Sequence, residues 1–127
     1  MNTRLVNPNK SAEAGHTFDL GGVTAEVVAL PGHTPINQGI FCPNEKVLFC
    51  ADCIVTDYIP NLEVGNPDLW REWLKSLDKI DALAPNTIVP GHGRVIRRDE
   101  ITEEISRISK FLLEAIQTGR APTGNNQ

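Results

Sequence analysis

Two histidines and one aspartate in this sequence occupy positions that favour metal chemistry. His33 and His92 each follow a Pro-Gly dipeptide, and Asp52 follows an apolar run that ends at Cys50. Each comes just after a predicted strand, and open α/β sheets place their ligands at the carboxyl ends of strands. Imidazole and carboxylate groups are suitable donors for zinc, iron or manganese. A single Pro-Gly-His is also an ordinary turn, so spacing alone leaves open whether the three side chains meet at one ion.

The cysteines suggest other chemistries that the pattern supports less well. Cys50 and Cys53 form a Cys-x-x-Cys, but a thioredoxin-type site needs the first thiol at a helix N-terminus, and here it ends a predicted strand. A zinc ribbon needs a second such pair, and Cys42 stands alone. The role of Cys50 and Cys53 stays open, with Cys53 retained as an additional thiolate donor beside the aspartate.

Hydrophobic alternation predicts the strands that position these residues. The first two strands form a hairpin with a Gly-Gly turn. The predicted strands span residues 17–20, 23–30, 36–42, 47–50 and 87–89. Because His16 precedes the first strand of the hairpin, we expect it at the opposite end of the sheet from His33.

Two amphipathic segments predict helices. Asn66-Pro67-Asp68 is typical of a helix start, with an N-cap, a proline at the first helical position and an acid near the positive dipole end. Apolar residues recur at helical spacing to Leu83, and Pro85 ends the pattern. A second helix is expected from Asp99 to a C-cap at Gly119. The order predicts an α/β fold, a small mixed sheet of four or five strands with both helices on one face.

Composition predicts one globular domain. The chain has 127 residues, 40% of them hydrophobic and 22% charged. We expect a lead-in over 1–15, a folded unit over 16–118 and a flexible tail over 119–127. A net charge of -4 with scattered basic residues argues against a nucleic-acid partner. No apolar run approaches the roughly 20 residues of a membrane span, and three cysteines, an odd number, favour the cytoplasm.

The motifs, taken in order, resemble the metallo-β-lactamase superfamily. The similarity covers roughly Gly15 to Ile116 and comprises Pro31-Gly32-His33-Thr34-Pro35, Val47-Leu48-Phe49-Cys50-Ala51-Asp52, a helix ending in Leu83-Ala84-Pro85, and Ile88-Val89-Pro90-Gly91-His92-Gly93. The family's domain is an αββα sandwich of two similar halves, so the resemblance implies the C-terminal half here. It also implies that His33 binds one metal, His92 binds a second, and Asp52 bridges them.

One family motif is missing from the sequence. The resemblance calls for an upstream His-x-His-x-Asp-His, which supplies two ligands to the first metal and an Asp and a His to the second, and here only His16 lies upstream. One chain would retain two ligands for each metal, whereas a stable zinc site needs about three or four. We therefore do not expect full two-metal hydrolase activity from one chain, and no catalytic base is identified. Ala51 and Ile36 also replace glycines that are frequent in the family.

Half a sandwich would leave one sheet face uncovered. We expect the inner face to carry Val27, Ile40, Phe41, Leu48 and Ile88. Such a face exceeds the few hundred Å² that soluble monomers tolerate, and burial contributes about 25 cal/mol per Å². We therefore expect a homodimer that packs sheet against sheet, since two-fold pairing is the commonest oligomer.

Three interpretations of function stay open. The chain is a metal-dependent hydrolase of an ester, thioester or lactam, active as a dimer. Alternatively it is a truncated, non-catalytic protein with a partial His/Asp metal site, or a fragment that complements a separate upstream half. Fold alone does not choose among them.

Overall fold

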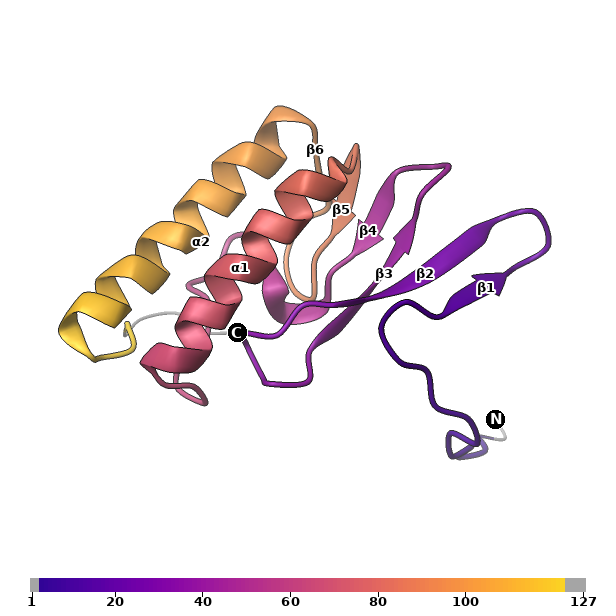
Figure 1. Ribbon diagram of the computed structural model, residues 1–127, viewed down its shortest axis with the longest axis horizontal. Helices are drawn as coiled ribbons and strands as arrows, with labels where there is room; N and C mark the ends of the chain where they lie inside the picture. Colours follow the sequence, from indigo (N-terminus) through magenta and orange to yellow (C-terminus); the bar gives the residue numbers. More distant parts are fainter. Residues whose placement is uncertain (1–2, 123–127) are drawn as a thin grey trace.

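A six-stranded sheet with strand order β1-β2-β3-β4-β5-β6 runs through the computed structural model, which describes residues 3–122 (Figure 1). The strands are β1 (Thr17–Asp19), β2 (Thr24–Ala29), β3 (Gln38–Cys42), β4 (Val47–Phe49), β5 (Thr87–Val89) and β6 (Ile96–Arg97). Neighbouring strands are antiparallel except β4 and β5, which are parallel. Because β4 and β5 run in the same direction, the loops that follow them emerge at the same edge of the sheet.

The two helices begin and end where their capping residues predict. In α1 (Pro67–Leu83), the Asn66 side chain accepts a hydrogen bond from the Leu69 amide at 3.0 Å, and Ala84 closes the other end with a φ of 50°. Helix α2 (Asp99–Thr118) ends at Gly119, whose φ is 72°. Helix α1 is the crossover between the parallel strands β4 and β5, so it fixes where the loops after those strands meet.

The core lies between the helices and one face of the sheet. Helices α1 and α2 run side by side and pack on each other (Figure 1). The sheet contributes a row of paired residues to this core, namely Phe41, Leu48, Ile88 and Ile96. The helices contribute chiefly Trp73, Leu77, Ile80, Ile108 and Leu112. The predicted mixed sheet with two helices on one face is confirmed, and the two-residue strand β6 is an addition to it.

The predicted composition of the uncovered face is wrong for three of its five residues. Phe41, Leu48 and Ile88 are paired with one another and lie buried beneath the helices. The opposite face carries another row of paired residues, Val27, Ile40, Phe49 and Val89. Side chains alternate between faces along a strand, so the consecutive residues Ile40 and Phe41 cannot share one.

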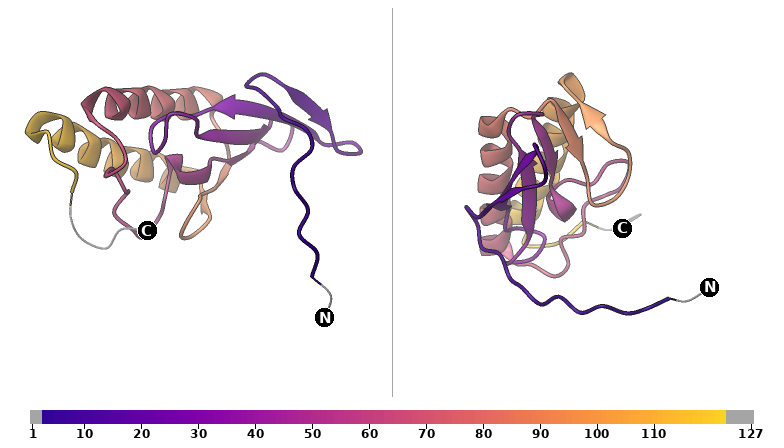
Figure 2. Two further views of the ribbon diagram at one scale, coloured as in Figure 1. Left: turned by 90° about the horizontal axis from the view of Figure 1, so that it is seen from below. Right: turned by 90° about the vertical axis from the view of Figure 1, so that its right-hand side faces the viewer.

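Just before β1, the Gly15 amide donates a hydrogen bond to the Val27 carbonyl of β2 at 2.8 Å, and the chain N-terminal to this point extends away from the sheet (Figure 2). The tail expected over 119–127 begins at the Gly119 cap, and its residues 123–127 lie outside the described part of the chain. Within residues 3–122, neither helix is both long enough and apolar enough to cross a bilayer.

Candidate metal centre

Asp52 stands at the edge of the sheet in a short 3-10 turn, Ala51–Cys53, directly after β4. Ala51 has a φ of 49°, in the left-handed region that glycine adopts more readily. This tight turn reverses the chain just past the strand, and it leaves the Asp52 carboxylate one-quarter exposed. The loop after the parallel strand β5 emerges beside it, because Cys50 donates its amide hydrogen to the Val89 carbonyl at 3.2 Å.

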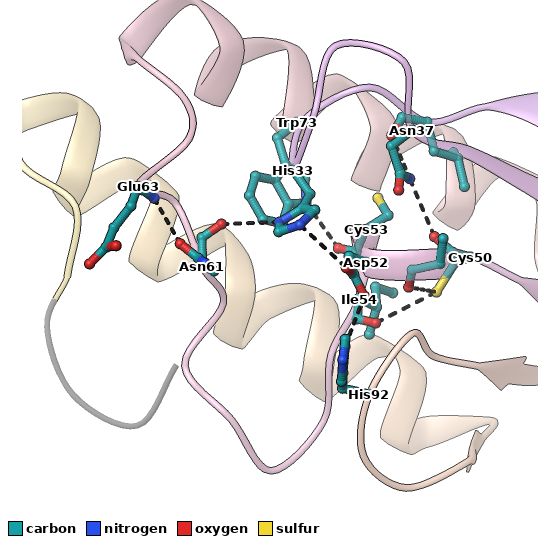
Figure 3. A network of polar contacts seen from close by, with 12 residues as sticks. His33, Asn37, Cys50, Asp52, Cys53, Ile54, Asn61, Glu63, Trp73 and His92 are labelled. Atoms are coloured by element: carbon teal, nitrogen blue, oxygen red, sulfur yellow. Dashed lines mark hydrogen bonds and ion pairs between the residues drawn. The ribbon is translucent and has the colours of Figure 1, made fainter. Parts of the chain in front are cut away.

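The structure brings the three candidate site residues together around that carboxylate (Figure 3). The Nε2 atom of His33 lies 3.3 Å from Oδ2 of Asp52. The Nδ1 atom of His92 lies 3.0 Å from Oδ1. Each imidazole therefore faces its own oxygen of one carboxylate, and that a metal joins them stays a prediction.

The three side chains contact one another and do not form a closed ligand shell. Among residues 3–122, no three His, Cys, Asp or Glu side chains surround a common point as metal ligands do. Their donor types are those of zinc, iron and manganese sites. This part of the chain therefore presents a partial set of donor groups.

The His33 ring is held by a second contact on its other nitrogen. Nδ1 lies 3.2 Å from the Asn61 carbonyl oxygen, in the loop between the 3-10 turn and α1. A carbonyl oxygen only accepts, so Nδ1 carries the hydrogen and Nε2 is the nitrogen turned to Asp52. The ring also packs edge-on against Trp73 with 6.0 Å between centroids, and its side chain is 17% exposed.

His92 is supported through its backbone. Its side chain is 50% exposed, and within residues 3–122 its ring makes its polar contact with Asp52. The flanking Gly91 donates its amide hydrogen to the Ala51 carbonyl at 2.6 Å. A Cβ on Gly91 would stand 2.7 Å from the carbonyl atoms of Ala51, so only glycine allows this approach.

The predicted position of His16 is wrong. In an antiparallel hairpin the first strand begins where the second ends, and the Val27 amide donates to the His16 carbonyl at 2.8 Å. His16 thus lies toward the end of β2 from which the chain continues to His33. Its side chain is exposed, and its ring packs on Phe18 with 4.5 Å between centroids.

The three cysteines are free and buried, and two of them, Cys50 and Cys53, flank Asp52 in the chain. Burial raises the pKa of Cys50 to about 12 and raises the pKa of Cys53 well above its ordinary value. The Cys53 side chain is fully buried, and this burial disfavours a thiolate donor at that position. The Cys53 carbonyl instead accepts a hydrogen bond from the indole of Trp73 at 2.9 Å.

Sequence reasoning missed two residues that support the site. Asn61 acts through its main-chain carbonyl, so its residue type carries no signal. Thr56 is fully buried and bonds to the loop that carries His92. A threonine in an irregular loop has no periodicity that would mark it as buried.

Comparisons with known proteins give consistent matches. The family model of the metallo-beta-lactamase superfamily matches residues 7–92. The chain is 37% identical over 95 residues to a beta-lactamase-like protein 2 homolog of Drosophila melanogaster, covering 75% of this chain and 29% of that protein. It is 35% identical over 91 residues to a hydroxyacylglutathione hydrolase of Ruegeria pomeroyi, covering 70% of this chain and 34% of that protein.

A solved structure shows the same fold. A metallo-beta-lactamase family protein from Thermus thermophilus superimposes with a TM-score of 0.72 at 18% identity, over 84% of this chain and 36% of that one. The chain spans less than a third of the length of the first curated relatives that it matches.

Proposed function

The chain belongs to the metallo-β-lactamase superfamily, and on that premise we propose that it contributes His33, Asp52 and His92 to a metal-dependent hydrolase centre. The ion is zinc, iron or manganese. The chain's described residues hold no closed ligand set. We propose that a second polypeptide supplies the remaining ligands. In this proposal the chain supplies part of a hydrolase rather than a complete two-metal enzyme.

The observation that carries the proposal is the environment of His33. One ring nitrogen faces the Asn61 carbonyl and the other faces the Asp52 carboxylate, and both partners are acceptors. A neutral imidazole has a single N–H, so it satisfies only one of them. In that tautomer the lone pair of Nε2 faces the carboxylate, and a metal ion bound between them would satisfy both groups. A cation there is matched by the carboxylate.

Each side chain has a definite part in this proposal. The Asn61 carbonyl orients the His33 ring so that Nε2 stays turned to Asp52, as outer-sphere partners of metal-binding histidines do. Asp52 holds both imidazoles at one place. When bound, a divalent ion lowers the pKa of a bound water to about 7 and polarises a substrate oxygen. The half-exposed His92 leaves the centre open on one side for that substrate.

The names of the relatives support hydrolysis as the reaction class. The similarity to the hydroxyacylglutathione hydrolase covers 70% of this chain and 34% of that protein. We propose an ester, thioester or lactam as the bond cleaved. The three free thiols also support the predicted location in the cytoplasm, where cysteines stay reduced.

Metal content tests the proposal directly. We expect protein purified without chelator, and reloaded with zinc, iron or manganese, to hold stoichiometric metal. A His33→Ala, His92→Ala double variant should lose it, whereas His16→Ala, at an exposed histidine outside the cluster, should retain it. Absence of metal from the wild-type protein at every added concentration would exclude a metal centre formed by this chain or its dimer and would favour a non-catalytic protein.

The face of the sheet that the helices do not cover is the surface on which we expect a partner chain to pack. It carries Phe18, which is 39% exposed, and Phe49, which is 45% exposed and paired with Ile40. We propose that a second copy of the chain packs on this face, sheet against sheet. The exposed aromatic side chains on this face support the proposal.

Sedimentation distinguishes a dimer from a complementing partner. We expect a dimer at micromolar concentration that Phe49→Glu dissociates, with Leu113→Glu, an exposed residue of α2, as the matched control. A well-folded monomer of the wild-type chain would exclude the homodimer. In that case, capture of a separate chain that bears the missing ligand motif would identify the complementing half.

A further inference from the structure

Thr56 links the segment that carries Asp52 to the loop that carries His92. Its side chain is 0% exposed. Its hydroxyl donates to the Arg94 carbonyl at 2.8 Å and accepts a hydrogen bond from the Arg94 amide. Its own amide donates to the His92 carbonyl at 3.0 Å. One residue therefore makes three hydrogen bonds to the chain just after the imidazole.

A second set of contacts fixes the chain just before the imidazole. The Gly91 amide donates to the Ala51 carbonyl at 2.6 Å and lies 3.3 Å from the Ile54 carbonyl. His92 is thus bracketed, with Gly91 joined to the start of the segment 51–56 and Arg94 joined to its end. Gly93, with a φ of 91°, allows the close approach, because a Cβ there would stand 2.7 Å from the carbonyl carbon of Thr56.

The hydrogen bonds on both sides of His92 determine where its ring lies. The side chain is half exposed, and within residues 3–122 no carbonyl orients its ring as the Asn61 carbonyl orients that of His33. Its position relative to Asp52 therefore follows from the path of residues 91–94. Asp52 belongs to the same segment as Thr56, so these hydrogen bonds also set the distance between the His92 ring and the Asp52 carboxylate.

We infer that Thr56 is a positioning residue whose hydroxyl keeps the His92 ring at the Asp52 carboxylate. The inference rests on the proposed function only in treating the His92 ring as a metal ligand. A residue that merely filled the core would not need its hydroxyl, and valine would serve equally well. Threonine is used because its hydroxyl satisfies both the N–H and the C=O of Arg94, which regular pairing does not reach.

Two substitutions of Thr56 distinguish the effect of its hydroxyl group from the effect of its side-chain shape. Thr56→Val retains the branched side chain and removes the hydroxyl, whereas Thr56→Ser retains the hydroxyl and removes a methyl group. Thr118→Val makes the same change at the exposed end of α2, outside the site. Each full-length variant is titrated with Co²⁺ and followed by its visible spectrum, and amide hydrogen exchange is measured at Arg94 and Gly91.

We expect Thr56→Val to weaken Co²⁺ binding by about 10- to 100-fold, the range typical when an outer-sphere partner is lost. Exchange at the Arg94 amide should accelerate at the same time. Thr56→Ser and Thr118→Val should remain within about threefold of wild type in binding, a range set by the scatter of conservative changes. Wild-type affinity and unchanged Arg94 protection in Thr56→Val would overturn the inference.

Co²⁺ binding tests the metal-centre proposal, whereas amide exchange and the His92 ring signal test the role of Thr56. If the wild-type protein binds no Co²⁺, the metal-centre proposal fails. Exchange at Arg94 and the NMR signal of the His92 ring then still decide whether the Thr56 hydroxyl holds the ring at Asp52. An unchanged ring signal in Thr56→Val would overturn the positioning role even without metal.

Discussion

The two Pro-Gly-His motifs place their imidazoles on one carboxylate but are held by opposite means. His33 is fixed through its side chain, which is bonded to the Asn61 carbonyl and packed against Trp73. His92 is fixed through the backbone on either side of it. The Pro-Gly-His sequence therefore does not indicate how its histidine is supported.

The glycines of the two motifs show the same contrast. A Cβ on Gly32 would meet Trp73, including its Cα at 2.8 Å, so the first motif is pressed against the core. A Cβ on Gly91 would meet the Asp52 side chain and the Ala51 carbonyl, so the second motif is pressed against the site. A change at Gly32 should therefore disturb the packing of the core and lower stability. A change at Gly91 should instead shift Asp52 relative to His92.

Alanine at each motif glycine should produce the largest and most divergent effects. We expect Gly32→Ala to lower the free energy of unfolding by about 2–3 kcal/mol, because the added methyl group overpacks the fully buried Trp73. Gly91→Ala should lower Co²⁺ affinity at least tenfold, because it displaces Asp52. Urea denaturation and Co²⁺ titration measure the two quantities. Equal loss of both quantities in both variants would remove the distinction between the motifs.

Removal of the Arg107 guanidinium should produce the next largest loss of stability, because it contacts the loop that carries both Thr56 and Asn61. Arg107 donates to the Val55 carbonyl at 2.7 Å, beside Thr56, and to the Tyr58 carbonyl at 2.8 Å, on the path to Asn61. We expect Arg107→Gln to lower the free energy of unfolding by about 2 kcal/mol, since hydrogen bonds to charged groups contribute about 1.5–3 kcal/mol.

A matched control is Arg71→Gln on the exposed face of α1. Arg71 pairs with Asp68 one helical turn away, and such exposed pairs contribute less than about 1 kcal/mol. If the two variants are equally stable, Arg107 does not anchor the loop. Faster amide exchange over residues 54–61 in the Arg107 variant alone would sharpen the assignment.

A smaller effect should come from the buried thiols of the segment between the motifs. Folding raises the pKa of Cys50 from 9.0 to about 12, so the native thiol keeps its proton where the unfolded thiol has lost it. The unfolded state then binds fewer protons, and the stability contributed below pH 9 is lost as pH rises toward 12. At pH 10 the loss is on the order of 1 kcal/mol for this thiol.

Denaturation at pH 7.5 and pH 10 measures this loss, and Cys50→Ala should reduce the difference between the two values. Cys53, whose pKa is raised in the same direction by burial, adds to the wild-type effect. An identical pH dependence in the Cys50→Ala variant would show that this thiol ionises as readily in the folded state as in the unfolded state.

Much of the fold was predictable from local pattern. The Asn66 cap, the Gly119 cap and the Gly-Gly hairpin turn each specify a backbone conformation within a few residues. The strand Ile96–Arg97 was not predictable, because two residues are too few to show alternation. The supports of the site were equally hidden, since Asn61 acts through a main-chain carbonyl that every residue type possesses.

The donor groups of the site and the turns that carry them could be recognised from residue types alone. Imidazole, carboxylate and Pro-Gly dipeptides are visible in the residue types, and their order along the chain indicated the family. That His33 and His92 face different oxygens of Asp52 depends on how distant strands pair, since β5 lies parallel to β4 across the α1 crossover and β3 joins the loop of His33 to β4. Strand register likewise decided that Phe41, Leu48 and Ile88 lie beneath the helices, since a shift of one residue would turn them to the other face.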